Sequence, residues 1–363
     1  MKTVIQAFTG GFGVSSNGSD ILEKLILNIA RSGAGSVMIG WNTDTPYDKI
    51  ISKLHERKKK VYLWIPVFAE YGNDAVTALD YLGNKHENAA SGADDDFTFA
   101  CPSKLRNIEL AVRYYDRYFS GCGFDGVFLD KIRYSSFGNG FKSGMGCFCE
   151  NCCDFYNNEG IDIGLFKKLM EHAKKDFLIP SARSGMRYIF ENGLIDALFR
   201  ARAKSITASV KKVVDLFRQR ELAIGLDVFA PPFAYLVGQD ITALAGCADF
   251  IKPMIYRVTN APAGIPYELE HMRAELMKNG CDIGNKLEML WNNENLVSED
   301  CFQNQLMLLK KISCDVYSGV EVNKADFCAT SITYVKKTID AIKESEISGC
   351  VLSWNVLAET VYP

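Results

Sequence analysis

The sequence predicts an α/β protein of the (β/α)8 TIM-barrel class, with a long insertion after the fourth strand. Three observations lead to this class. Short apolar runs rich in β-branched residues alternate with longer segments of helical period. Eight such units occur within 363 residues, and a 48% apolar content is enough for one large core. We therefore expect a single domain over residues 1–363, with a cysteine-rich excursion at about 131–221.

The strands are expected at residues 3–8, 36–41, 61–67, 126–130, 222–228, 250–256, 316–322 and 350–355. Runs such as VYLWIPV and GVFLD have the near-continuous apolar character of strands that are buried on both faces. Helices are expected over 20–33, 45–60, 203–220 and 332–346, where apolar residues recur every three or four positions. The segment 286–296 fits either a strand or a helix.

The charge and the hydropathy of the chain argue against nucleic acid and membranes as partners. The net charge of -3 comes from 41 basic and 44 acidic residues spread along the chain, which argues against nucleic acid as a partner. The chain has no apolar stretch of membrane-spanning length and no signal-peptide pattern, so we expect no membrane partner and a cytoplasmic location. The 12 cysteines are then expected to be reduced. A homo-oligomer is compatible with the sequence.

Polar residues gather where the predicted strands end, which is the active-site face of this fold. We predict Asp130 as one catalytic carboxylate and either Asp227 or Glu321 as the other. The residues expected to bind substrate are Trp41, Glu70, Arg133, Tyr134, Lys252, Tyr256, Arg257, Asn323, Trp354 and Asn355. Aromatic rings stack on sugars, and two carboxyl groups cleave glycosidic bonds. The set predicts a glycoside hydrolase that acts on a small carbohydrate or oligosaccharide without an organic cofactor.

Charged neighbours refine these roles. Lys252 stands inside an apolar strand and needs an acidic partner, for which Asp227 and Asp130 are the candidates. The cations Lys131 and Arg133 favour the charged form of Asp130, which suits a nucleophile or charge stabiliser. A carboxyl separation of about 5 Å would indicate retention of configuration, and about 6.5 to 9.5 Å inversion.

A thiol cluster occupies the excursion. Cys147, Cys149 and Cys152 form a C-x-C-x-x-C pattern, and Cys101 lies upstream of the fourth strand. Four thiolates in two patches predict a closed, structural Zn²⁺ site. Cys153 is a neighbour or an alternative ligand. An iron-sulfur cluster or a redox pair remains an alternative, although the spacing matches neither common ferredoxin pattern.

The cysteine pattern resembles the zinc site of glycoside hydrolase family 42 β-galactosidases. "GFDGVFLD" and "LDKIRY" are similar to the strand 4 of uncharacterised glycoside-hydrolase-like barrels and of the α-polygalactosaminidase family, and "ADFIKPMIY" to their strand 6. The resemblance implies a catalytic Asp130, accompanied by Arg133 and Tyr134. The strand-4 acid of the β-galactosidases falls on Ile132, so their mechanism is not expected here.

Two other functions fit the same residues. A sugar-binding or degenerate glycosidase-like barrel would keep the aromatic platform and lack the acid/base pair. A metal or redox enzyme would use the cysteines for its chemistry. The barrel fold alone does not distinguish these alternatives, because it supports many reactions.

Overall fold

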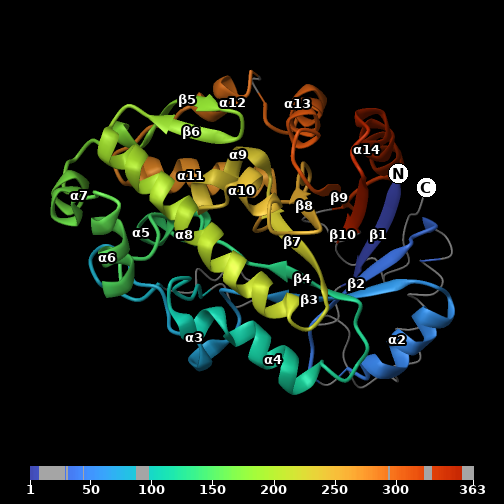
Figure 1. The fold of residues 1–363 in the computed structure, drawn as a ribbon. Helices are drawn as coiled ribbons and strands as arrows, with labels where there is room; N and C mark the ends of the chain where they lie inside the picture. The colour runs from blue at the N-terminus through green and yellow to red at the C-terminus, as the bar shows by residue number, and fades with distance from the viewer. Residues whose placement is uncertain are drawn as a thin grey trace.

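A computed structural model describes residues 1–7, 29, 32–43, 45–86, 98–292, 295–322 and 329–353. It confirms the predicted class, because eight parallel strands close into a barrel in chain order (Figure 1). The barrel strands are β1 (Lys2–Ala7), β2 (Ser36–Gly40), β3 (Lys60–Pro66), β4 (Gly126–Asp130), β7 (Ala223–Phe229), β8 (Phe250–Met254), β9 (Asp315–Glu321) and β10 (Gly349–Ser353). All eight lie at the predicted positions.

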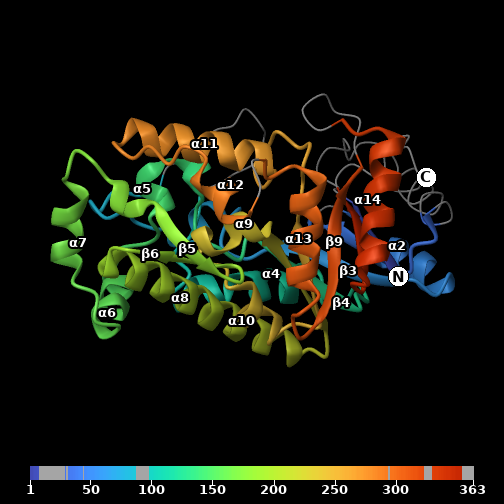
Figure 2. The same ribbon diagram turned by 90° about the horizontal axis from the view of Figure 1, so that it is seen from above.

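Helices surround the barrel on its outer face, as the two views of the ribbon show (Figures 1 and 2). They are α2 (Tyr47–Glu56), α3 (Leu105–Ile108), α4 (Leu110–Tyr118), α5 (Phe141–Gly144), α6 (Glu150–Asn158), α7 (Ile163–Met170), α8 (Gly193–Arg218), α9 (Pro231–Ala234), α10 (Ile241–Ala245), α11 (Ile265–Lys278), α12 (Lys286–Leu290), α13 (Glu299–Leu309) and α14 (Ile332–Ser345). Within the described ranges, none of these helices combines the length and apolarity needed to cross a bilayer.

Three predicted helices can be compared with the structure. The segments 45–60 and 332–346 contain α2 and α14, and the ambiguous segment 286–296 contains the short helix α12. The segment 203–220 is the second part of α8, which begins ten residues earlier than predicted. It begins there because the Asn192 side chain accepts hydrogen bonds from the backbone N–H groups of Leu194 and Ile195. Most of the predicted helix 20–33 lies outside the described residues.

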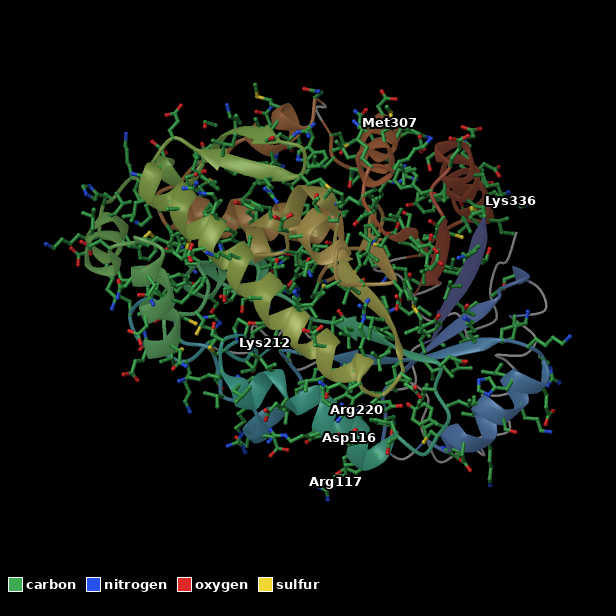
Figure 3. All side chains as sticks on the ribbon, in the orientation of Figure 1. Asp116, Arg117, Lys212, Arg220, Met307 and Lys336 are labelled. Carbon is green, nitrogen blue, oxygen red and sulfur yellow. The ribbon has the colours of Figure 1, made fainter. Side chains whose placement is uncertain are left out.

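The excursion after β4 forms a lobe beside the barrel. Helices α5, α6 and α7 are followed by an antiparallel hairpin of β5 (Pro180–Ser184) and β6 (Arg187–Phe190), which the sequence analysis did not predict. Helix α8 then runs from this lobe back along the barrel (Figure 1). Its C-terminal end is tied to α4, because Arg220 Nε donates to Asp116 Oδ1 at 2.6 Å (Figure 3).

Seven strands contribute one large side chain each to a cluster inside the barrel, namely Val4, Met38, Tyr62, Phe128, Phe250, Tyr317 and Val351. The rings of Phe128 and Phe250 stack with their centroids 6.1 Å apart. Gly225 of β7 lies against these two rings, and a Cβ atom at this position would be 2.1 Å from Phe250. The barrel interior is therefore filled, and a substrate can enter only at its ends.

We expect Gly225→Ala to destabilise the protein by about 1–3 kcal/mol or more, because the added methyl group overpacks the barrel interior. The free energy of unfolding in urea is the measurement. Gly193→Ala is the matched control, since a Cβ there meets nothing within 4 Å. Equal stability of the two variants would contradict this packing.

Candidate active site

Asp130 ends β4 and lies at the mouth of the barrel. Phe128 points into the barrel, so the side chain of Asp130, two residues later, lies on the same face of the strand. Its Oδ2 accepts a hydrogen bond from Trp64 Nε1 at 2.9 Å, and its Oδ1 accepts one from the backbone N–H of Lys131. The residue is only half-buried. Asp130 is thus a carboxylate that is held in place and still accessible from the mouth.

Asp227 lies beside Asp130 on the neighbouring strand. Leu129 of β4 is in register with Leu226 of β7, so the next residue of each strand is an aspartate that faces the barrel interior. Neighbouring strands lie about 4.8 Å apart. Burial is the main cause of the raised pKa of Asp227, and the charge on the neighbouring Asp130 raises it further. The prediction of two carboxylates at one end of the barrel therefore has a geometric basis.

The environment of Asp227 differs sharply from that of Asp130. Asp227 is 2% exposed, and its Oδ2 accepts a hydrogen bond from Lys252 Nζ at 2.9 Å. Burial raises the pKa of Asp227 to about 7, against the lowering effect of the Lys252 charge. Oδ1 has no hydrogen-bond partner among the described residues. A proton can therefore reside on Asp227 near neutral pH.

Lys252 is the buried cation of the barrel interior. It is 1% exposed and donates to Asp227 and, at 2.9 Å, to Gln6 Oε1 of β1. Burial lowers the pKa of Lys252, but the charges and hydrogen bonds of Asp227 and Tyr256 together outweigh this effect, so the pKa is raised. The ring of the buried Tyr256 has its centroid 5.1 Å from Nζ. The predicted pairing of Lys252 with Asp227 is confirmed.

A second ion pair lies on the other side of Asp130. Lys131 Nζ binds Glu70 Oε1, and Trp41 Nε1 donates to Glu70 Oε2 at 3.1 Å. Both partners of the ion pair have positive φ angles, 72° at Glu70 and 51° at Lys131. Non-glycine residues in this region of φ/ψ space are strained and concentrate at functional sites. Trp41 packs against Tyr71, with ring centroids 5.4 Å apart.

Arg133 is clamped between two aromatic rings. Its guanidinium carbon lies 4.5 Å from the centroid of Phe99 and 4.2 Å from that of Phe229. Burial lowers its pKa to about 10, and the charges of Glu268, Asp130 and Asp227 act in the opposite direction. Its Nη1 donates to the carbonyl oxygen of Tyr134 at 2.9 Å. The sequence had placed it at this face, but gave no indication of the rings that hold it.

Glu321, a predicted catalytic residue, accepts five hydrogen bonds. Oε1 accepts from the backbone N–H groups of Val258 and Thr259 and from the Thr259 hydroxyl, at 2.7–2.8 Å. Oε2 accepts from the backbone N–H of Arg257 at 3.0 Å and from the Tyr334 hydroxyl at 2.5 Å. Neither oxygen is left for a substrate. These contacts are those of an anchor for the loop after β8.

Two predicted substrate-binding residues also make structural contacts. The Arg257 guanidinium donates to Glu299 at 2.8 Å and to Thr338 at 2.9 Å, so it points between α13 and α14. The Tyr134 side chain is buried, and its hydroxyl donates to Ser205 Oγ of α8 at 3.2 Å. Three further predicted residues, Asn323, Trp354 and Asn355, lie outside the described residues.

Sequence reasoning missed three residues of the site. Trp64 and Gln6 sit at inward-facing positions of their strands, and alternation from Tyr62 and Val4 would have found both. Glu268 is buried in α11 and reaches Arg133 electrostatically. No pattern in the sequence marks Glu268, because it is one of several acidic residues on an amphipathic helix.

The four predicted cysteine ligands come together. The Sγ atoms of Cys101, Cys147, Cys149 and Cys152 all lie within 4.8 Å of one another and are buried. Cys101 Sγ lies 3.5 Å from Cys149 Sγ and 3.6 Å from Cys152 Sγ. A disulfide requires about 2.05 Å, whereas zinc–sulfur bonds of about 2.3 Å place tetrahedral sulfurs about 3.8 Å apart. The cluster can therefore hold a tetrahedral metal ion.

The first turn of α6 supplies half of this cluster. Cys149 is the N-cap residue and Cys152 lies one turn later. Hydrogen bonds from Cys101, Cys147 and Cys152 lower the pKa of Cys149. Cys153 points away, with its Sγ 3.2 Å from the carbonyl oxygen of Phe148. It is therefore not a member of the cluster.

A chain of hydroxyl groups joins the cysteine cluster to the segment that follows β4. Cys152 Sγ lies 3.4 Å from Ser103 Oγ, and Ser103 Oγ lies 3.2 Å from Ser205 Oγ. Ser205 Oγ accepts the hydrogen bond of Tyr134, the neighbour of Arg133. The "LDKIRY" segment and the cysteine cluster are thus linked through three hydroxyl groups.

Comparison with known proteins bears on the fold. No protein-family model matches the sequence, and no curated protein matches it. The structure resembles the glycoside hydrolase domain of PgaB (BpsB) from Bordetella bronchiseptica, with a TM-score of 0.57, 10% identity, and coverage of 99% of this chain and 95% of that one. It also resembles the catalytic domain of β-amylase from Paenibacillus polymyxa, with a TM-score of 0.53, 10% identity, and coverage of 98% and 92%. The chain therefore shares the (β/α)8 barrel fold of these two domains.

Lys252→Met tests the buried pair. Folding raises the pKa of Asp227 from 3.8 to about 7. Asp227 therefore makes its full contribution to the free energy of unfolding below about pH 4, and this contribution is lost as the pH rises through 7. Removal of the cation should cost about 3–5 kcal/mol at pH 8, where Asp227 is ionised, and clearly less at pH 5. Urea unfolding at both pH values measures the difference.

The matched control is Lys2→Met, which breaks the exposed Lys2–Asp315 pair. It should cost at most about 1 kcal/mol at either pH. A loss for Lys252→Met that is the same at pH 5 and pH 8 would show that Asp227 does not change its protonation in this range.

Proposed function

We propose that the protein is a glycoside hydrolase whose two catalytic carboxyl groups belong to Asp130 and Asp227. One observation carries the proposal: the two side chains face the same end of the barrel, in register on adjacent strands, and only Asp227 is fully buried, with a raised pKa. Such a difference in environment is what assigns acid and base roles to a carboxyl pair. The fold of a glycoside hydrolase domain and of a β-amylase catalytic domain supports the reaction class.

The surroundings of each carboxyl group favour a different role. Both oxygens of Asp130 accept hydrogen bonds, from Trp64 and from the backbone of Lys131, as an ionised carboxylate does. Asp130 then attacks or stabilises the anomeric carbon. Asp227 has a raised pKa, so it can hold the proton that a general acid gives to the leaving oxygen. Its Oδ1 is buried, so this transfer requires the substrate to gain access to it.

The strand spacing favours retention of configuration. The backbones of adjacent strands lie about 4.8 Å apart, so two carboxyl groups that project in parallel from in-register positions have a similar separation. Retaining enzymes hold their carboxyl groups about 5–5.5 Å apart, whereas inverting enzymes need about 6.5–9.5 Å to admit a water molecule. Asp130 is then the nucleophile of a double displacement. The partly exposed ring of Trp41, which packs on the buried Tyr71, is the candidate aromatic surface for a sugar of a small oligosaccharide.

A second candidate is a sugar-binding barrel without catalysis. The observation in its favour is the burial of Asp227, whose side chain is 1% exposed and pairs with Lys252. If Asp227 never meets the substrate, Asp130, Glu70 and Trp41 would bind sugar hydroxyl groups without cleaving a bond.

We further propose that the cysteine cluster binds Zn²⁺ and that this site is structural. Cys101, Cys147, Cys149 and Cys152 supply four sulfurs, which fill a tetrahedral coordination sphere and leave no position for a reactive water. Bound zinc would join α6 to the segment before α3 and so fix the excursion next to β4. A redox role is disfavoured by the burial of all four thiols.

The test of the proposed reaction is the pair Asp130→Asn and Asp227→Asn. Both should lower kcat by at least 10³-fold, because loss of one carboxyl group removes a step of the displacement. The measurement is hydrolysis of aryl glycosides and oligosaccharides, with the anomer of the product followed by NMR. Asp125→Asn, at the opposite end of β4, should retain activity.

The sugar-binding candidate predicts the opposite pattern. Wild-type protein would bind oligosaccharides in calorimetry and hydrolyse none, and Asp227→Asn would leave the dissociation constant unchanged. That result would exclude the hydrolase.

The metal site is tested by elemental analysis. Wild-type protein should contain one zinc ion per chain, and Cys101→Ser should lose it together with a large part of its thermal stability. Cys122→Ser is the control, because the Cys122 thiol lies outside the cluster and contacts the carbonyl oxygen of Tyr118. Iron in place of zinc, with absorption in the visible range, would instead favour the redox alternative.

A further inference from the structure

A fully buried arginine lies in the excursion without an acidic partner. Arg202 of α8 is 0% exposed, and its Nη2 donates to the carbonyl oxygens of Gly144 and Leu236, each at 3.0 Å. Its Nε and Nη1 have no hydrogen-bond partner among the described residues, and none of the ion pairs found there includes it. A buried charge without a counter-charge costs several kcal/mol. The fold must therefore offset this cation in another way.

Neutral groups offset only part of the charge. The guanidinium carbon lies 4.7 Å from the ring centroid of Phe199 and 5.2 Å from that of Tyr134. Cation–π contacts of this kind contribute about 2 kcal/mol when desolvated. An arginine also stays protonated when buried, so it cannot escape the cost by losing its proton. An anion close to Arg202 would supply the missing compensation.

The cysteine cluster is the nearby group that can become anionic. Gly146 directly precedes Cys147, and a Cβ atom on Gly146 would lie 2.9 Å from Arg202 Nε and 3.6 Å from the Tyr156 hydroxyl. Arg202 Nη2 also donates to the carbonyl oxygen of Gly144, three residues before Cys147. The guanidinium therefore lies against the backbone turn that leads into the cysteine cluster.

The charge of the cluster depends on what it holds. Four protonated thiols are neutral, whereas four thiolates around a divalent ion carry a net charge of about -2. The N-terminus of α6, where Cys149 and Cys152 lie, contributes only about half a positive charge. We infer that Arg202 is the counter-ion of a dianionic centre in which four thiolates bind one divalent, thiophilic metal ion. This inference rests on the proposed metal site and specifies its charge state.

The two charges must then stabilise each other reciprocally. Metal binding lowers the cost of burying Arg202, and Arg202 raises the affinity for the metal by the same factor. Arg202 also lies against the ring of Tyr134, whose hydroxyl leads through Ser205 and Ser103 to Cys152. Arg202 is therefore a positioning residue of the metal centre, on the side that faces the "LDKIRY" segment.

The experiment compares the full-length chain with Arg202→Met, Arg202→Lys and Lys204→Met. Lys204 is the matched control, because it lies on the same helix and pairs with Glu159 at the surface. The metal is removed, and Co²⁺ is titrated against a competing chelator while the sulfur-to-cobalt charge-transfer absorption is followed. We expect Arg202→Met to weaken Co²⁺ binding at least tenfold. Arg202→Lys should stay within threefold of wild type, and Lys204→Met should not change the affinity.

The lysine variant separates charge from hydrogen bonding. It keeps the cation but loses the two bonds to Gly144 and Leu236, so its thermal midpoint should fall while its metal affinity is kept. If both Arg202 variants lose affinity equally, or neither loses any, the counter-ion role is wrong. If Arg202→Met does not fold, Arg202→Gln takes its place, because it also removes the charge; it should weaken Co²⁺ binding at least tenfold, and wild-type affinity in this variant would refute the counter-ion role. Failure of wild-type protein to bind Co²⁺ through thiolates would instead show that the metal site itself is absent.

Discussion

The burial of a charged pair inside a parallel barrel is the constraint around which the rest of the site is arranged. Asp227 and Lys252 occupy inward positions of adjacent strands, where an apolar residue would be the cheapest choice. Lys252 cannot be left without partners, so Gln6 of β1 reaches it from across the barrel. Asp130 lies at the rim beside the pair and is exposed to its field. The chemistry proposed for the mouth therefore depends on the buried polar group of Asp227, Lys252 and Gln6 inside the barrel.

The fold could be predicted because its determinants are local. Each barrel strand is a short run rich in apolar residues, many of them β-branched or aromatic, and such a run can be recognised from the sequence alone. The start of α8 was missed because the helix begins at a capping side chain, Asn192, and not at a change in hydrophobic period. The β5–β6 hairpin was missed because SARSGMRY contains few of the residues that favour strands.

The site could be predicted only in part, because residue type indicates that a partner is needed and not which partner is found. Lys252 within an apolar strand required a carboxylate, and only two candidates were in reach, so the pairing followed. Glu321 required a partner equally, but its five donors come from the loop after β8 and from α14, whose approach depends on the whole barrel. Cysteine spacing was a stronger signal, because metal geometry restricts which spacings are useful.

The anchoring of the loop after β8 by Glu321 has a consequence for recognition. Backbone N–H groups of three successive residues, Arg257 to Thr259, are bonded to one buried carboxylate. These bonds restrict the conformations of the loop without any ligand. A ligand that contacted the loop would therefore lose little binding free energy to ordering these residues. Selectivity there would depend on shape, since a restrained wall adapts less to a ligand than a mobile loop does.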